Sequence, residues 1–263
     1  GGEIKLGGNA LAIVALAEYT RQTGDEQYLP LMRDMARWIV GVQAANGEFT
    51  IHQQYHSTGE AQTFTSEYYP GEALLGLLRL YALDPDEAWL DAAARGATWL
   101  ITVRDGDLTD AQLSHDHWLL YALNELYRYR PDALYYDHAM RIAGAIVQAQ
   151  HLDPPYPDWV GGYYTPPRST PAATRGEGLS AAYQLARDFG TPEQAQPILE
   201  AMQRGASFAL RTQFYPETAM YLANPQRALG GFHTSLTDYE IRIDYVQHNI
   251  SSLLGLYRAQ GGE

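Results

Sequence analysis

Hydrophobic positions along the chain predict a repeated pair of helices. Helices of the first kind are apolar on nearly every side and carry few charges. They are expected at Asn9–Tyr19, Glu72–Tyr81, Trp118–Tyr127, Glu177–Ala186 and His248–Tyr257. A helix that is hydrophobic all round must be buried on most of its sides. These five segments are therefore predicted to form an inner layer.

Helices of the second kind alternate with the first and are amphipathic. Their apolar residues recur at steps of three and four, and Arg, Asp or Glu occupy the opposite face. They are expected at roughly Tyr28–Ala44, Glu87–Val103, Ala133–Gln150 and Pro192–Arg211. Strict alternation of a buried and a half-buried helix predicts about four and a half hairpins, with an inner ring of helices inside an outer ring.

The links between these helices differ in length. Links from inner to outer helices are short and carry turn residues, as in Asp84-Pro85-Asp86. Links back to the inner helices are long: Gly47–Pro70, Asp105–Asp116, Asp153–Arg175 and Tyr215–Asp244. Long loops often carry function. Glu48–Tyr55 alternates like a short strand and Gly230–Leu236 is a second candidate, so the prediction is an all-α fold with minor β structure in the loops.

The segment YYPGEALLGLLRLYALDPDEAWLDAAARGATWLI, residues 68–101, carries a family resemblance. It resembles the hairpin repeat of the (α/α) toroid superfamily, which includes six-hairpin glycosidases, sugar 2-epimerases and the helical domain of glucuronyl C5-epimerases. The resemblance implies an (α/α) toroid, an incomplete or complete α/α barrel of about four to six helical hairpins. We expect residues 1–263 to form one such domain, and the abrupt start at Gly1-Gly2-Glu3 is consistent with a piece of a longer chain.

The amino-acid composition excludes several classes of partner and site. Asp plus Glu number 31 against 18 Lys plus Arg, giving a net charge of −13 that repels a phosphate backbone, so no nucleic acid partner is expected. No apolar stretch approaches the roughly 20 residues of a membrane span, and the sequence leaves the compartment and the oligomeric state open. The chain has no Cys, which excludes disulfides, thiolate zinc sites and the Cys/Cys/His site of the lanthionine cyclases that resemble this ring.

No cofactor is expected, because the chain lacks a phosphate loop, a dinucleotide fingerprint, a HExxH helix and a Gly-x-Ser-x-Gly elbow. The DxDD signature of class II terpene cyclases is also missing. Two histidines, His115 and His117, are close enough in sequence to suggest a metal, but we favour other roles and assign no metal ligands. Sugar chemistry remains the function that the superfamily resemblance implies.

Polar residues near the starts of the inner helices are the candidate catalytic groups. They are Glu72, Asp116, His117, Glu177, Asp244 and His248. Several titratable side chains that converge on one axis are typical of an active site. A structural alternative exists for each: Glu72 suits the positive end of a helix dipole, and Asp116 suits an N-cap. Arg242 and Asp244 could instead form a buried ion pair that closes the ring.

Aromatic and polar loop residues are the candidate substrate contacts. Flat rings with hydroxyl edges suit sugar faces, and Arg grips carboxylates. The predicted contacts are Tyr68, Tyr69, Trp118, Trp159, Tyr163, Arg175, Arg242 and Gln247. Arg175 could alternatively pair with Glu177, which lies between two glycines.

The sequence favours a carbohydrate-active enzyme that acts on a glycan. A glycoside hydrolase would draw two carboxylates from Glu72, Asp116, Glu177 and Asp244. A uronate epimerase or lyase would use Arg175 or Arg242 to neutralise the substrate carboxylate, with His117, His248 or Tyr69 as a base. The alternative is a non-catalytic helical module of a larger protein that binds glycan or protein.

Overall fold

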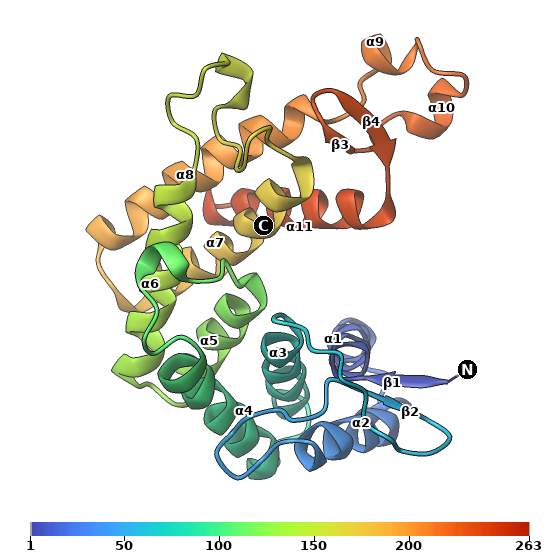
Figure 1. Ribbon diagram of the computed structural model, residues 1–263, viewed down its shortest axis with the longest axis vertical. Helices are drawn as coiled ribbons and strands as arrows, with labels where there is room; N and C mark the ends of the chain where they lie inside the picture. Colours follow the sequence, from blue (N-terminus) through green and yellow to red (C-terminus); the bar gives the residue numbers. More distant parts are fainter. Residues whose placement is uncertain (1, 263) are drawn as a thin grey trace. The chain divides into compact units, whose positions relative to one another are not determined.

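The computed structural model describes residues 2–262, and the chain is predominantly helical (Figure 1). It divides into two compact units after Ala139. Unit 1 comprises residues up to 139 and unit 2 the residues from 140 onward. Helix α6 (Ala133–Ala149) crosses this division. Among the described residues, no helix combines the length and the apolar character that crossing a bilayer requires.

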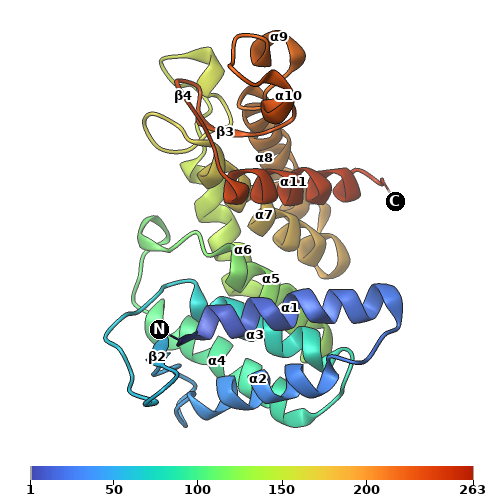
Figure 2. The ribbon, with the colours of Figure 1, turned by 90° about the vertical axis from the view of Figure 1, so that its right-hand side faces the viewer.

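Unit 1 is built around α3 (Tyr69–Tyr81). This helix packs against α1 (Leu6–Thr23) and α5 (His117–Tyr129), and also against α2 (Leu29–Gly41) and α4 (Glu87–Trp99), as Figure 2 shows. Leu74, Leu77, Leu78 and Leu80 are fully buried in it. Each such leucine stabilises the fold by roughly 2 kcal/mol. Helix α3 is therefore an inner helix, as its apolar sequence predicts.

Unit 2 is built around α7 (Ser169–Phe189), which packs against α8 (Pro192–Arg211) and α11 (Ile243–Ala259). Small residues let α7 and α11 approach closely. A Cβ added at Gly176 would lie 2.1 Å from Ser252 Oγ, and one at Gly255 would lie 2.7 Å from Ser180 Cβ. Larger side chains at these glycines would force the two helices apart.

The β structure is confined to two small antiparallel pairs. Strand β1 (Glu3–Lys5) pairs with β2 (Gln53–Tyr55), with Ile4 opposite Gln54. Strand β3 (His233–Ser235) pairs with β4 (Asp238–Ile241), after the single-turn helices α9 (Pro216–Ala219) and α10 (Pro225–Ala228). The predicted minor β content is confirmed, although the strand expected over residues 48–55 is only its last three residues.

All nine predicted helices are present among the described residues, but two inner helices begin at least five residues earlier than expected. Helix α7 starts at Ser169 rather than Glu177, and α11 starts at Ile243 rather than His248. Pro171 lies in the first turn of α7, where a missing backbone N–H costs no hydrogen bond, so the proline does not delay that helix. The prediction that Glu177 and His248 open their helices is therefore wrong, and both lie inside them.

Candidate active site

Glu72 is the most strongly perturbed acid of unit 1. It lies in the first turn of α3, is 6% exposed, and its Oε2 has no hydrogen-bond partner among the described residues. Helix α1 packs directly over it, because a Cβ at Gly7 would lie 2.1 Å from Glu72 Oε2. Burial, and secondly the negative charge of Asp116, raise the pKa of Glu72 from 4.5 to about 7. This carboxyl group therefore retains its proton to near-neutral pH.

Asp116 precedes α5 and is fully buried at 0% exposure. One carboxylate oxygen accepts the Leu119 backbone N–H at 3.0 Å, which confirms the predicted N-cap. The other oxygen accepts a bond from Arg104 Nη1 at 3.1 Å. Burial raises the pKa of Asp116, while Arg104 and the cap oppose that shift. Both oxygens of this acid are thus engaged.

Arg104 connects Asp116 to a buried pair that the sequence analysis missed. It ends a short π-helical turn, η1 (Leu100–Arg104), and its Nε and Nη2 bind the two oxygens of Asp105 at 2.7 and 2.8 Å. Asp105 also lies 3.0 Å from His138 Nε2 on α6. Burial would raise the pKa of Asp105, but hydrogen bonds from His138 and Arg104 outweigh it and lower that pKa. The only sequence signal was an imidazole among the apolar positions of the helix predicted at residues 133–150.

Aromatic rings surround the first turns of α3 and α5. The rings of Tyr68 and His117 are 6.0 Å apart, and those of His117 and Trp118 are 4.8 Å apart. Tyr69 stacks on His52 with 6.2 Å between centroids. A Cβ at Gly71 would lie 3.0 Å from Trp118 Cβ, so the two first turns touch. The structure thus brings together six predicted site residues: Tyr68, Tyr69, Glu72, Asp116, His117 and Trp118.

Unit 2 holds a second acid–base pair, between a buried glutamate and a partly buried histidine. Glu177 on α7 and His248 on α11 lie 2.8 Å apart, Oε2 to Nδ1. Burial lowers the pKa of His248, but the hydrogen bond and charge of Glu177, with the charge of Asp244, raise it overall. The contact with Glu177 therefore favours the protonated form of the His248 imidazole.

Arg175 stacks on the tyrosine doublet of unit 2. Its guanidinium lies 4.7 Å from the Tyr163 ring centroid and 4.9 Å from that of Tyr164, and it donates to the Tyr164 hydroxyl at 2.9 Å. Tyr163 is buried beneath it, and burial raises the pKa of the Tyr163 hydroxyl. Tyr164 is exposed and has a positive φ of 68°. The predicted contact Tyr163 is thus covered, and the ring open to a ligand is that of Tyr164.

The remaining predicted residues of unit 2 lie at its surface. Arg242 and Asp244 form an ion pair at 3.0 Å, but their side chains are 56% and 33% exposed. The alternative of a buried pair is therefore wrong, because α11 begins just before Asp244 and leaves both side chains in water. Gln247 is exposed, and Trp159 is partly buried beside His151 and Tyr156.

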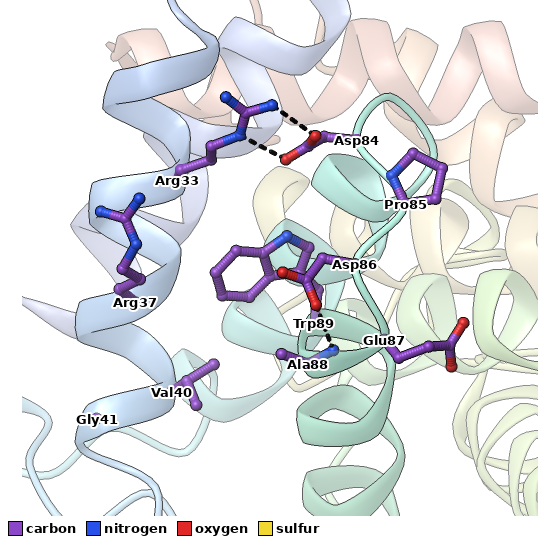
Figure 3. Close-up of a pocket in the computed structure, with 10 residues that line it drawn as sticks. All are labelled: Arg33, Arg37, Val40, Gly41, Asp84, Pro85, Asp86, Glu87, Ala88 and Trp89. Carbon is purple, nitrogen blue, oxygen red and sulfur yellow. Dashed lines mark hydrogen bonds and ion pairs between the residues drawn. The ribbon is translucent and has the colours of Figure 1, made fainter.

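A pocket of about 890 Å³ lies elsewhere in unit 1, between α2 and the start of α4 (Figure 3). Arg33 and Asp84 face each other across it and form two hydrogen bonds, at 2.7 and 2.6 Å. Arg33 lowers the pKa of Asp84, so this acid stays ionised near neutral pH and is unsuited to proton transfer there. The described lining includes none of the predicted site residues.

Neither unit by itself gathers three carboxylate or imidazole ligand atoms around one point, among the described residues.

Comparison with known proteins identifies the fold. No family model matches the chain, and no curated protein matches it. The fold is similar to that of an inactive variant of the alpha-1,6-mannanase GH76A of Salegentibacter sp. HEL1_6, with two aspartates changed to asparagine, in complex with alpha-1,6-mannotriose. The two chains are 16% identical, the match covers 98% of this chain and 76% of the mannanase chain, and the TM-score is 0.61. The predicted all-α, (α/α) toroid fold is thereby confirmed.

Proposed function

We propose that this chain is a carbohydrate-active enzyme that hydrolyses a glycan, and that Glu72 is its general acid. The observation that carries the proposal is the state of this carboxyl group: it is buried, and its pKa is about 7. A glycosidase needs one carboxylic acid that is still protonated at working pH, to donate a proton to the leaving oxygen. Glu72 meets that requirement by its environment.

Asp116 supplies part of that environment. Its charge contributes to the raised pKa of Glu72, while its own oxygens are held by Arg104 and by the start of α5. Two acids whose surroundings separate their roles are the usual basis for assigning a proton donor. Because Asp116 is fully buried and fully engaged, its proposed role is electrostatic rather than nucleophilic.

The surrounding rings suit a sugar. Tyr68 is 44% exposed and Trp118 is partly buried, both at the first turns that carry Glu72 and Asp116. Aromatic faces stack on the apolar faces of sugars, and the tyrosine hydroxyl can bond to their edges. The mannanase with the same fold was solved with alpha-1,6-mannotriose, so alpha-1,6-linked mannosides are the first substrates to test.

Hydrolysis also needs a second carboxylate, as a base or a nucleophile. The mannanase variant replaces two consecutive aspartates, whereas this chain contains no Asp-Asp pair. The second group must therefore be assigned from this chain's own residues. Of the other predicted acids Glu177 is buried, and the Glu177→Gln variant tests whether it is needed for hydrolysis.

A substrate panel tests the proposal. Purified wild type, Glu72→Gln, Glu177→Gln and the exposed loop control Glu60→Gln would be incubated with neutral and uronic-acid glycans, including alpha-1,6-mannotriose. New reducing ends report hydrolysis, unsaturated-product absorbance reports elimination, and deuterium uptake from solvent reports epimerisation. We expect new reducing ends from the wild type and from Glu60→Gln, with a loss of about 10²–10⁴-fold in Glu72→Gln.

Other outcomes would redirect the assignment. Unsaturated product or deuterium uptake without new reducing ends would indicate a uronate lyase or epimerase, for which Arg175 and His248 are the candidate residues. Glycan binding without any turnover would indicate a non-catalytic module. Full hydrolytic activity in Glu72→Gln would refute the role of Glu72 as the acid.

A further inference from the structure

Three buried polar residues of unit 1 and the partly buried Arg104 form one continuous chain of hydrogen bonds. It runs from Asp116 through Arg104 and Asp105 to His138, with distances of 3.1, 2.7 and 3.0 Å. Asp116, Asp105 and His138 are all buried. Nε and Nη2 of Arg104 are both used by Asp105, which leaves Nη1 to reach Asp116 and, at 3.3 Å, the backbone oxygen of Glu67.

Burial makes Asp116 depend on this arginine. A carboxylate removed from water and left without a cation takes up a proton rather than keep its charge. Asp116 contacts the guanidinium through a single nitrogen, so the orientation of that guanidinium decides whether the contact exists. The two-pronged bond to Asp105 fixes the plane of the guanidinium, since Arg and carboxylate match each other in this geometry. His138 in turn holds Asp105.

We propose that Arg104 is a positioning residue that keeps the Asp116 carboxylate ionised beside Glu72, and that Asp105 and His138 hold the guanidinium in place for this task. The inference rests on the proposed function only in taking Glu72 as the acid whose proton matters. Other titratable groups near the first turns of α3 and α5 are Glu67, Tyr69 and His117. Burial and the charge of Asp116 are the causes of the raised pKa of Glu72 within unit 1.

Titration of Glu72 in the intact chain tests the proposal without any substrate. The ¹³C resonance of its side-chain carboxyl would be followed against pH in wild type, Asp116→Asn, Arg104→Gln and the double variant. Asn also caps helices well, so Asp116→Asn removes the charge and keeps the cap. We expect Asp116→Asn to lower the pKa of Glu72 from about 7 only part of the way to 4.5, because burial, the larger cause of the raised pKa, remains.

Arg104→Gln should lower the pKa of Glu72 as well, because Asp116 then takes up a proton and loses its charge. The double variant should match the Asp116→Asn variant, since the arginine acts through Asp116 and the two effects are not additive. An Arg104→Gln variant in which the pKa of Glu72 stays at about 7 or rises would overturn the proposal, and so would additive shifts in the double variant.

Further variants guard against simple misfolding. Arg104→Lys keeps the charge but loses the two-pronged bond to Asp105, so it should shift the titration of Glu72 in the same direction as Arg104→Gln, by a smaller amount. Arg33→Gln removes another paired arginine of unit 1 and should leave that titration unchanged. His138→Gln keeps a donor for Asp105 and should behave like wild type, whereas His138→Ala should shift the titration in the same direction as Arg104→Gln. A His138→Ala titration identical to wild type would remove His138 from the proposal.

The titration separates this inference from the proposed function. If Arg104→Gln shifts the pKa of Glu72 as expected but no glycan is turned over by wild type, the network stands and the hydrolase assignment fails. If glycan is hydrolysed and the pKa of Glu72 is the same in Arg104→Gln as in wild type, the hydrolase assignment is supported and the positioning role of Arg104 is refuted. Where both hold, Arg104→Gln should lower kcat with little change in KM, because the arginine does not contact the glycan.

Discussion

The Glu72→Gln variant should lose a pH dependence of stability that the buried carboxyl imposes on the wild-type chain. The pKa of Glu72 is about 7 in the folded protein, against an ordinary value of 4.5. Between these values the folded state binds more protons than the unfolded state, so the free energy of unfolding falls as pH rises. The penalty is absent below pH 4.5 and complete above about pH 7.

The magnitude follows from the same two values. One pKa unit corresponds to about 1.4 kcal/mol, so a rise from 4.5 to about 7 costs the ionised form about 3 kcal/mol. The side chain is almost wholly buried, so solvent screens little of this. Glutamine has nearly the same shape without the charge. Any cost of burying its amide, about 1–3 kcal/mol, is independent of pH and cancels in the comparison across pH.

The assay is urea unfolding of wild type and Glu72→Gln at a series of pH values on both sides of this window. As pH rises from about 4.5 to about 7, the unfolding free energy of Glu72→Gln should increase relative to that of wild type by about 3 kcal/mol. The exposed control Glu60→Gln should show no such movement. Parallel pH curves for wild type and Glu72→Gln would refute the reasoning, because Glu72 would then titrate alike in the folded and unfolded chains.

Two further predictions concern stability. Urea unfolding should show that alanine lowers the free energy of unfolding more at Gly47 than at Gly24, although both glycines have positive φ. A Cβ at Gly24 meets nothing within 4 Å, so a loss of about 1–2 kcal/mol is expected there. A Cβ at Gly47 lies 2.3 Å from the Arg95 carbonyl oxygen, so a loss of about 2–5 kcal/mol is expected there. Equal losses would contradict this. The hydrogen bond to Glu177 raises the pKa of His248 above 6.5, so it stabilises the fold fully below that pH and is lost as pH rises through the folded pKa. Wild type should therefore exceed His248→Gln in stability more at low pH than at high pH, and a difference that grows with pH would contradict the pairing.

Local pattern was enough to predict the helices, because each inner helix is an apolar run whose burial needs no knowledge of its neighbours. Helix α3, expected from Glu72 to Tyr81, was found from Tyr69 to Tyr81. The start of α7 could not be predicted in the same way, because Ser169–Gly176 is polar and glycine-containing. Its helical state is imposed by packing against α8 and α11.

The candidate site was predictable only in part. Glu72 and Asp116 stood out as acids at helix starts, and the cap role of Asp116 follows from local sequence. The burial of Glu72 depends on Gly7, far away in the chain, which lets α1 close over the carboxyl. Arg104 and Asp105 are neighbours in the sequence, but His138 comes from α6, and no spacing in the sequence connects it to them. Conversely, Arg242 and Asp244 alternate with apolar residues as a buried pair would, yet lie in water.

The most direct test of Glu72 as a general acid compares two glycosides with different leaving groups. A poor leaving group needs a proton from the enzyme, whereas a dinitrophenolate leaves without one. The measurement is kcat/KM of wild type and Glu72→Gln on alpha-1,6-mannotriose and on the alpha-dinitrophenyl mannoside. The account predicts a loss of about 10²–10⁴-fold on the mannotriose and little loss on the activated glycoside. An equal loss on both substrates, or none on either, would contradict it.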